Sequence, residues 1–230
     1  MGKMIELTAS DGHKFAAYRA DPVGANAGKP RGAIVVIQEI FGVNSHIKLV
    51  TDGYAADGYL AIAPALFDRV QRNVDLGYSP EDIAKGREIR GKVTNDMAMK
   101  DAEAAIKAAH LSLGNAGKVG IVGYCWGGLV SWLAAAKLPG LSAAVPYYGG
   151  GILDNADLEP KVPLMGHFGE RDAHIPVDGV RKLSAKHAKH QIFIYAADHG
   201  FNCDHRGSYD APAAKQARER TLAFFRKHVG

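Results

Sequence analysis

Residues 118–128 read KVGIVGYCWGG, an apolar run that ends in a glycine-rich turn. The run has the composition of a buried strand and Leu129–Lys137 that of a helix, so Cys125 lies at the apex of a strand-to-helix turn. Cys125 takes the central position of a Gly-x-nucleophile-x-Gly motif, where serine is more usual. Side chains at Gly123 or Gly127 would collide in so sharp a turn. The stretch therefore predicts a nucleophile at a helix N-terminus, where the helix dipole favours a thiolate.

Strand and helix patterns alternate on both sides of this turn. The expected strands are Ile5–Thr8, His13–Tyr18, Ala33–Ile37, Tyr59–Ala63, Ser142–Tyr147, Val162–Phe168 and Gln191–Tyr195. The expected helices are Ser45–Asp57, Asn95–Leu111, Val177–Ala188 and Ala211–His228, the last with Asp210 as its N-cap. Arg69–Val93 is charged and less regular, and no helix or strand is assigned to it. The alternation predicts an α/β fold, with an opening hairpin and a mostly parallel central sheet covered by helices on both faces.

The composition indicates one ordinary globular domain spanning residues 1–230, with 47% hydrophobic and 23% charged residues. The net charge of +4 is spread along the chain, and its densest group, Arg181–His190, is typical of a solvated helix face. No nucleic-acid partner is therefore expected. The sequence shows no secretory signal or membrane span, and two cysteines do not make a disulfide framework. We expect a cytoplasmic monomer or small homo-oligomer with no membrane partner.

Candidate acid and base residues follow the nucleophile in the order that this motif requires, acid first and histidine second. Asp172 follows a predicted strand and can accept the Nδ1–H of a histidine, although Glu170 in the same loop is an alternative acid. His199 follows the next predicted strand. The carboxyl ends of parallel strands share one edge of a sheet, so His199 is expected near Cys125 as general base and acid. Either residue could instead be an ordinary loop residue.

The spacing of metal-ligating residues disfavours a metal site. His199, Cys203 and His205 are close in sequence, but their spacing matches no common zinc pattern and no second cluster completes it. Acyl transfer to a cysteine requires no cofactor. The sequence therefore predicts a hydrolase without metal or cofactor.

Three motifs resemble the dienelactone hydrolases (carboxymethylenebutenolidases), a cysteine branch of the α/β-hydrolases. They are QEIFGVN at 38–44, GYCWGG at 123–128 and DHGF at 198–201. The resemblance extends over nearly the whole chain and implies the α/β-hydrolase fold. It also implies a catalytic triad of Cys125, Asp172 and His199, and it favours Asp172 over Glu170. The implied reaction opens a small lactone or ester, such as a dienelactone, to an open-chain oxo acid such as maleylacetate.

The resemblance also implies roles for residues around the triad. Glu39 would hold the resting thiol neutral and take its proton when the carboxylate of the substrate binds. The backbone N–H groups of Ile40 and Trp126 would form the oxyanion hole. The Trp126 side chain is bulkier than the aliphatic residue expected there, and it could narrow the pocket. Further substrate contacts are expected from Phe41, Tyr124, Arg87 and Arg206.

The arginines expected to bind the substrate carboxylate depart from the family pattern. One should precede the long helix, where Arg87 and Arg90 are both candidates and alignment favours Arg87. The other should follow the catalytic histidine, but Cys203 stands four positions after His199. The nearest arginine is Arg206, which would need a different loop path. All three arginines could instead be ordinary surface residues.

Two other functions remain open from the sequence. The chain could be a carboxylesterase for another substrate on the same scaffold, because a fold does not determine a substrate. It could also be a non-catalytic ligand-binding or redox-sensing protein in which Cys125 is merely oxidisable. A complete triad argues against the second, since binding alone does not need Asp172 and His199.

Overall fold

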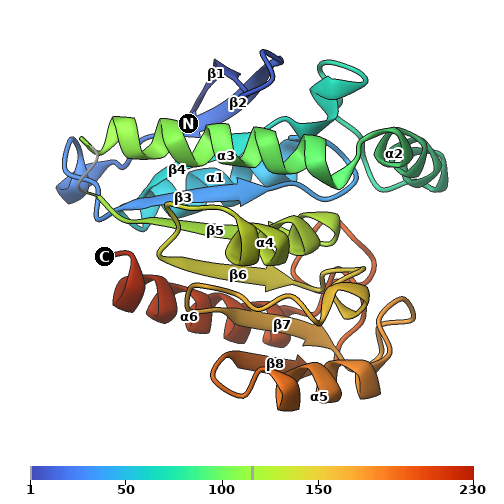
Figure 1. Cartoon of the computed structure of the whole chain (residues 1–230). Helices are drawn as coiled ribbons and strands as arrows, with labels where there is room; N and C mark the ends of the chain where they lie inside the picture. Colours follow the sequence, from blue (N-terminus) through green and yellow to red (C-terminus); the bar gives the residue numbers. More distant parts are fainter. Residues whose placement is uncertain (1, 115–116) are drawn as a thin grey trace.

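The computed structural model describes residues 2–114 and 117–230, which form one eight-stranded sheet between layers of helices (Figure 1). Residues 1, 115 and 116 of the expected single domain lie outside the described residues. The strands are β1 (Lys3–Thr8), β2 (Lys14–Ala20), β3 (Ala33–Ile37), β4 (Leu60–Pro64), β5 (Val119–Tyr124), β6 (Ala143–Tyr147), β7 (Met165–Gly169) and β8 (Gln191–Tyr195). Their order in the sheet is β1-β2-β4-β3-β5-β6-β7-β8. The β1–β2 hairpin and the β2–β4 pair are antiparallel, and the remaining pairs are parallel.

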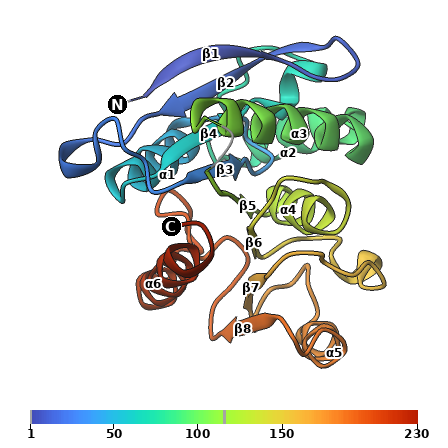
Figure 2. The same ribbon diagram turned by 60° about the vertical axis from the view of Figure 1, so that its left-hand side comes forward.

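Helices cover both faces of the sheet, as the alternating pattern predicts. They are α1 (Ser45–Ala56), α2 (Pro80–Lys92), α3 (Asn95–Ser112), α4 (Trp126–Lys137), α5 (Val177–Lys186) and α6 (Ala211–His228), with short 3₁₀ turns η1 (Gly24–Asn26), η2 (Leu66–Arg69) and η3 (Leu153–Asn155). Figure 2 shows α1 and α6 on one face and α3, α4 and α5 on the other. In the part of the chain that the structure describes, no helix is both long and apolar enough to cross a membrane.

The central strands are buried along their whole length, which explains their continuous apolar runs. Every residue of β3, β4, β5, β6 and β7 is buried. A fully buried Val or Ile side chain contributes about 1.5–3 kcal/mol through the hydrophobic effect, so these strands hold much of the core energy. Because β3 and β5–β8 are parallel, the loops that follow β3, β5, β7 and β8 emerge at one edge of the sheet.

Helix α2 lies within Arg69–Val93, the charged and less regular segment for which the sequence predicted no helix. It buries only Gly86 and Ile89, so its apolar pattern is too weak to reveal a helix. Its start is nevertheless encoded locally. Ser79 accepts a hydrogen bond from the Asp82 N–H at 3.1 Å, and Asp82 accepts one in return from the Ser79 N–H at 3.4 Å. This capping box, followed by proline at the first helical position, was the signal in the sequence.

Most boundaries lie within two residues of prediction, and two element starts differ by three residues. Helix α4 begins at Trp126 rather than Leu129, so its first turn contains two glycines. These glycines are required by packing, because a Cβ at Gly127 would lie 2.5 Å from backbone oxygens at the end of β3. Strand β7 begins at Met165 rather than Val162. Pro163 has no N–H to donate, which limits regular pairing in the residues before Met165.

Candidate active site

Cys125 occupies the strained apex between β5 and α4 (Figure 1). Its backbone angles are φ +54° and ψ −119°, in a region that residues other than glycine rarely adopt. A Cβ at Gly123 would collide with the carbonyl oxygen of Gly127, so this turn cannot accept larger residues at that position. Cys125 is also the residue immediately before α4. The strained backbone conformation thus places this thiol at a helix N-terminus.

Asp172, and not Glu170, contacts His199. The His199 Nδ1 lies 2.7 Å from Asp172 Oδ2, while Asp172 Oδ1 accepts the backbone N–H of His174 at 2.8 Å. The carboxylate of Asp172 is fully buried, and both of its oxygens have partners. Glu170 instead faces solvent and pairs with Arg181 at 3.3 Å. The loops after β7 and β8 therefore bring the predicted acid and base together.

His199 is adjacent to the thiol of Cys125. Burial lowers the pKa of His199, but hydrogen bonds with Asp172 and Cys125 outweigh it and raise that pKa from 6.5 to about 10. An imidazole with this pKa is protonated at neutral pH. The imidazolium form of His199 can stabilise a thiolate once one is formed beside it, and the thiolate is the form in which cysteine is nucleophilic.

A pocket of about 360 Å³ opens over the thiol. It is lined by Ile40, Phe41, Ile83, Arg87, Cys125, Gly150, His174, His199 and Arg206. Ile83 and Arg87 come from α2, so the helix that the sequence analysis missed forms one wall. This volume suits a small organic substrate rather than a polymer.

Arg87 and Arg90 take different places on α2. Arg87 is exposed and lines the pocket. The guanidinium of Arg90 lies 4.6 Å from the ring centroid of Trp126 and donates to the carbonyl oxygen of Val93 at 2.8 Å. The structure thus brings Arg87, and not Arg90, to the pocket.

Arg206 reaches the pocket by the longer loop path that the sequence required. Two successive turns carry the chain there, with the Cys203 N–H bonded to the Gly200 oxygen at 3.0 Å and the Arg206 N–H to the Cys203 oxygen at 3.1 Å. Gly200 has φ +79°, and the guanidinium of Arg206 fills the space that a Cβ would need. Arg206 Nη1 then donates to Glu39 Oε1 at 3.0 Å. Glycine beside His199 is therefore needed both for the turn and for the arginine.

Glu39 lies just after β3 and is only 1% exposed. One carboxylate oxygen binds Arg206, and the other is buried without a hydrogen-bond partner among the described residues. The structure therefore places Glu39 against Arg206, whereas the family resemblance implies that it holds the resting thiol. A buried carboxylate with one free oxygen retains the capacity to take a second partner.

The two residues expected to form the oxyanion hole lie near Cys125, since Trp126 follows it in the chain and Ile40 lines the same pocket. Within the described residues, neither the N–H of Ile40 nor that of Trp126 donates to another protein group. The carbonyl of Ile40 packs against Gly86 of α2, where a Cβ would collide with it. The Trp126 side chain is buried and stacks on Phe67, with ring centroids 5.6 Å apart. Trp126 is not a lining residue of the pocket, so its bulk does not narrow it.

Phe41 lines the pocket as expected, but Tyr124 does not. Tyr124 is fully buried beside Tyr147, with ring centroids 4.8 Å apart. It follows that Tyr124 is a packing residue of the sheet edge. His174, Ile83 and Gly150 line the pocket in addition, and no motif or spacing in the sequence identified them.

Comparison with known proteins places the chain among hydrolases. Residues 15–229 match the dienelactone hydrolase family. "Putative carboxymethylenebutenolidase" of Synechocystis sp. is 37% identical over 233 residues, covering 94% of this chain and 93% of that protein. "Carboxymethylenebutenolidase" of Pseudomonas putida is 34% identical, covering 96% of this chain and 94% of its own length. The crystal structure titled "Putative Dienelactone Hydrolase from Klebsiella pneumoniae" has a TM-score of 0.84 at 34% identity, with 98% and 100% coverage. These similarities confirm the α/β-hydrolase fold and the predicted resemblance.

Proposed function

The chain belongs to the dienelactone hydrolase family and is a hydrolase of lactones or esters. We propose that it opens a small carboxylate-bearing lactone through the thiol of Cys125. A dienelactone that yields an open-chain oxo acid is the proposed substrate type. The single eight-stranded sheet supports the further proposal that residues 1–230 act as one catalytic domain.

The observation that carries this proposal is the arrangement around one thiol. Cys125 stands at a positive-φ apex, His199 lies beside it, and Asp172 is 2.7 Å from the far nitrogen of His199. The nucleophile, the base and the orienting acid thus have the spatial arrangement that acyl transfer requires. A protein that only binds a ligand has no need of a buried aspartate aligned on the histidine.

In the proposed acylation step, the thiolate of Cys125 attacks the lactone carbonyl. The N–H groups of Ile40 and Trp126 stabilise the oxyanion of the tetrahedral intermediate. As the intermediate collapses, the ring C–O bond breaks and the proton of the His199 imidazolium passes to the leaving oxygen, which leaves His199 neutral. An enolate oxygen leaves readily, so a lactone of this type suits a thiolate better than an amide does. The product of this step is a thioester on Cys125.

Deacylation uses the same residues in reverse. Neutral His199 removes a proton from water, and the resulting hydroxide attacks the thioester carbonyl. The thiolate leaves, the free acid dissociates, and His199 is again protonated. Asp172 holds the imidazole in one tautomer throughout and stabilises its positive charge.

The two pocket arginines support a substrate that carries a carboxylate. Arg87 makes no hydrogen bond or ion pair with any described residue, and Arg206 is bound only through one nitrogen to Glu39. Guanidinium groups bind carboxylates through paired hydrogen bonds. When a substrate carboxylate engages Arg206, Glu39 is released from its partner. In this proposal the freed glutamate accepts the proton of any neutral Cys125 thiol.

Hydrolysis of a cis-dienelactone and of a neutral aryl ester, by wild type and Cys125→Ala, tests the proposal. We expect rapid turnover of the lactone and its loss in the variant, with an acyl adduct on the peptide that contains Cys125. Thermal unfolding of both proteins controls for folding. Cysteine-dependent turnover of the ester alone would keep the triad and identify a carboxylesterase. Turnover by Cys125→Ala equal to that of wild type would overturn the mechanism, and no turnover of either substrate would favour a binding or redox-sensing protein.

A further inference from the structure

A second group of reactive side chains lies directly behind Glu39. Glu39, His46 and Cys203 each offer one oxygen, nitrogen or sulfur atom, and these atoms all lie within 4.8 Å of one another. They come from the loop after β3, from α1 and from the loop after β8. The three side chains are 1%, 4% and 0% exposed. We call these three residues the Glu39–His46–Cys203 cluster.

Two polar atoms of this cluster are buried with no hydrogen-bond partner in the described chain. They are Glu39 Oε2 and His46 Nε2. Leaving a buried polar atom unsatisfied costs about 1–3 kcal/mol, and such atoms are rare in folded proteins. Two of them at one point indicate a ligand that both can bind.

The imidazole of His46 is oriented for a metal ion by a carboxylate on its other side. His46 Nδ1 lies 3.3 Å from Asp204 Oδ1. A carboxylate at this distance favours the tautomer with the proton on Nδ1, which leaves the lone pair on Nε2, the buried atom without a partner among the described residues. Carboxylate–histidine pairs of this kind orient metal-bound histidines and raise their basicity.

Burial and the carboxylate of Glu39 raise the pKa of the Cys203 thiol to about 12, against smaller opposing effects of the Tyr78 hydroxyl and the His205 backbone N–H. Cys203 is therefore a neutral thiol until a cation lies beside it, and the charge of a bound metal ion is what deprotonates a coordinating thiol. Imidazole, thiolate and carboxylate together form a ligand set for zinc, whereas Mg²⁺ and Ca²⁺ take oxygen ligands only.

We propose that the Glu39–His46–Cys203 cluster binds Zn²⁺ or a chemically similar divalent transition metal ion, with Asp204 as the orienting partner of His46. Zinc bonds of about 2.0–2.3 Å place tetrahedral ligands about 3.3–3.8 Å apart, so movements of about 1 Å close the site. On binding, Cys203 loses its thiol proton to solvent, and three protein ligands leave a fourth position for water. The surface hollow lined by His46, Asn202 and Asp204 gives the ion a route in.

The consequence for catalysis rests on the proposed function. A cation on Glu39 Oε2 holds that carboxylate away from Cys125 and neutralises its charge. Glu39 can then no longer accept the proton of the thiol, so the bound metal inhibits hydrolysis. The binding itself does not depend on any role of Glu39 in catalysis.

Titration of the metal-free full-length protein with Co²⁺ tests the binding directly. We expect one strongly bound Co²⁺ with a sulfur-to-cobalt charge-transfer absorption, displaced by Zn²⁺ and not by Mg²⁺. Cys203→Ser should abolish this absorption, while Asp204→Asn should weaken binding by about 10–100-fold. His46→Gln should weaken it at least as much and serves as the second ligand variant if Cys203→Ser does not fold.

Two control variants separate this site from the catalytic thiol and from a surface group of possible ligands. Cys125→Ser removes the only other cysteine and should keep the absorption. Glu159→Gln removes a ligand from the surface group Glu159, His187 and His190, and it should also leave the absorption intact. An absorption that survives Cys203→Ser and disappears in Cys125→Ser would assign the metal to the catalytic thiol and overturn the proposal. Strong binding without any charge-transfer absorption, lost in Glu159→Gln, would overturn it equally.

Zn²⁺ inhibition of hydrolysis is the second measurement. The concentration that halves turnover should rise by at least tenfold in His46→Gln relative to wild type. If the lactone and ester are not hydrolysed at all, the proposed function fails while the cobalt result still decides the metal site. Equal inhibition of wild type and His46→Gln would contradict the inhibitory role.

Discussion

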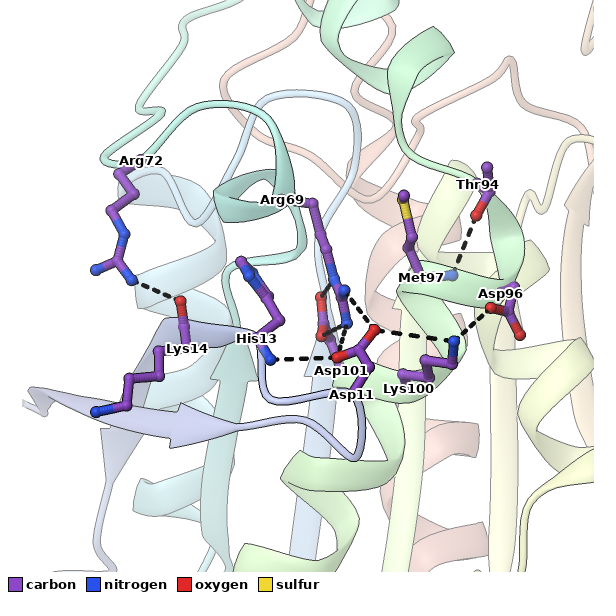
Figure 3. Close-up of polar contacts among 10 residues, drawn as sticks. All are labelled: Asp11, His13, Lys14, Arg69, Arg72, Thr94, Asp96, Met97, Lys100 and Asp101. Atoms are coloured by element: carbon purple, nitrogen blue, oxygen red, sulfur yellow. Dashed lines mark hydrogen bonds and ion pairs between the residues drawn. The ribbon is translucent and has the colours of Figure 1, made fainter.

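Two buried arginine–carboxylate pairs in this molecule are built in opposite ways. The first, which we call the Arg69 cluster, consists of Arg69, Asp101, Asp11 and Lys100, and Figure 3 shows its contacts. Arg69 binds Asp101 through Nε at 3.0 Å and Nη2 at 2.6 Å, and it binds Asp11 through Nη1 at 2.7 Å. Both oxygens of the fully buried Asp101 have partners. The cluster thereby ties the β1–β2 turn to η2 and α3.

The second pair joins Arg206 to Glu39 by a single hydrogen bond of 3.0 Å. The other carboxylate oxygen of Glu39 has no partner among the described residues, and the same is true of the nearby His46 Nε2. The contrast teaches that burial alone does not make an ion pair structural. A pair in which both carboxylate oxygens have hydrogen-bond partners holds elements in place. A pair with one oxygen unsatisfied is less stable, but its carboxylate can change partners.

The largest expected difference between the pairs concerns turnover on substitution of Glu39. Glu39→Gln keeps an oxygen for Arg206 but removes the proton acceptor, so kcat should fall by about 10²–10⁴-fold. The free energy of unfolding should change by about 1 kcal/mol or less, since the lost ion pair is offset by relief of an unsatisfied charge. Steady-state kinetics and urea unfolding measure the two quantities. Turnover within twofold of wild type would mean that Glu39 is not the acceptor.

The Arg69 cluster should respond in the opposite manner. Asp101→Asn leaves the buried guanidinium of Arg69 without its main counter-charge, and this should cost about 3–5 kcal/mol of unfolding free energy. Turnover of the folded protein at low temperature should remain. The matched control is Asp75→Asn, which breaks an exposed pair with Lys48 at 3.1 Å and should cost less than about 1 kcal/mol. Equal losses in the two variants would show that burial does not decide the value of the pair.

The sequence predicted the fold well wherever apolar patterning reports burial. Strands β3 and β8 and helix α6 lie at the expected residues, because short apolar runs rich in β-branched or aromatic residues indicate strands and a two-faced helix shows a 3.6-residue period. Helix α2 was missed because it lies over the pocket and buries little. The capping box is the sequence signal for this helix, and hydrophobic periodicity does not reveal caps.

Some residues of the site could likewise be predicted from the sequence, and others could not. Cys125, Asp172 and His199 each follow a strand, so the parallel sheet alone brings them to one edge. The neighbours of Glu39 could not be derived, since its proximity to His46 and Cys203 depends on how two loops fold over one helix. The contact of Arg206 with Glu39 likewise depends on the turns after His199, which no spacing rule describes.

Arg87 provides an intermediate case, a charged side chain of the pocket with no hydrogen bond or ion pair to any residue that the structure describes. Arg87→Gln should lower kcat/KM for a carboxylate-bearing lactone by about 10–100-fold, the worth of a charged hydrogen bond of about 1.5–3 kcal/mol. Turnover of a neutral ester should be almost unaffected. Lys85→Gln on the same helix is the control, because Lys85 pairs with Glu88 and is not a lining residue of the pocket. Equal losses for both substrates would exclude carboxylate recognition by Arg87.

The pH dependence of His199 extends the comparison to the catalytic pair. Its pKa of about 10 in the folded protein exceeds the ordinary value of 6.5, so the pair with Asp172 stabilises the fold below pH 6.5. That contribution should be lost as the pH rises from 6.5 towards 10. Nuclear magnetic resonance of the His199 ring should therefore show an imidazolium at pH 8, and Asp172→Asn should lower the midpoint. A midpoint near 6.5 in the wild type would refute the pairing.

The smallest expected effect is the pH dependence of stability that comes from Asp11, at the exposed edge of the Arg69 cluster. It is opposite in sign to the effect of His199, because it is lost as the pH falls. The hydrogen bond from Arg69 lowers the pKa of Asp11 from 3.8 to about 2. A carboxylate whose pKa is lowered on folding stabilises the protein above its unfolded value and loses this effect as the pH falls from 3.8 to 2. The difference in unfolding free energy between wild type and Asp11→Asn should thus be constant near neutral pH and shrink below pH 4. A difference in unfolding free energy that persisted unchanged at pH 2 would mean that the Arg69–Asp11 contact is not electrostatic. Only the pair of Arg69 with Asp101 would then distinguish the Arg69 cluster from the pair of Arg206 with Glu39.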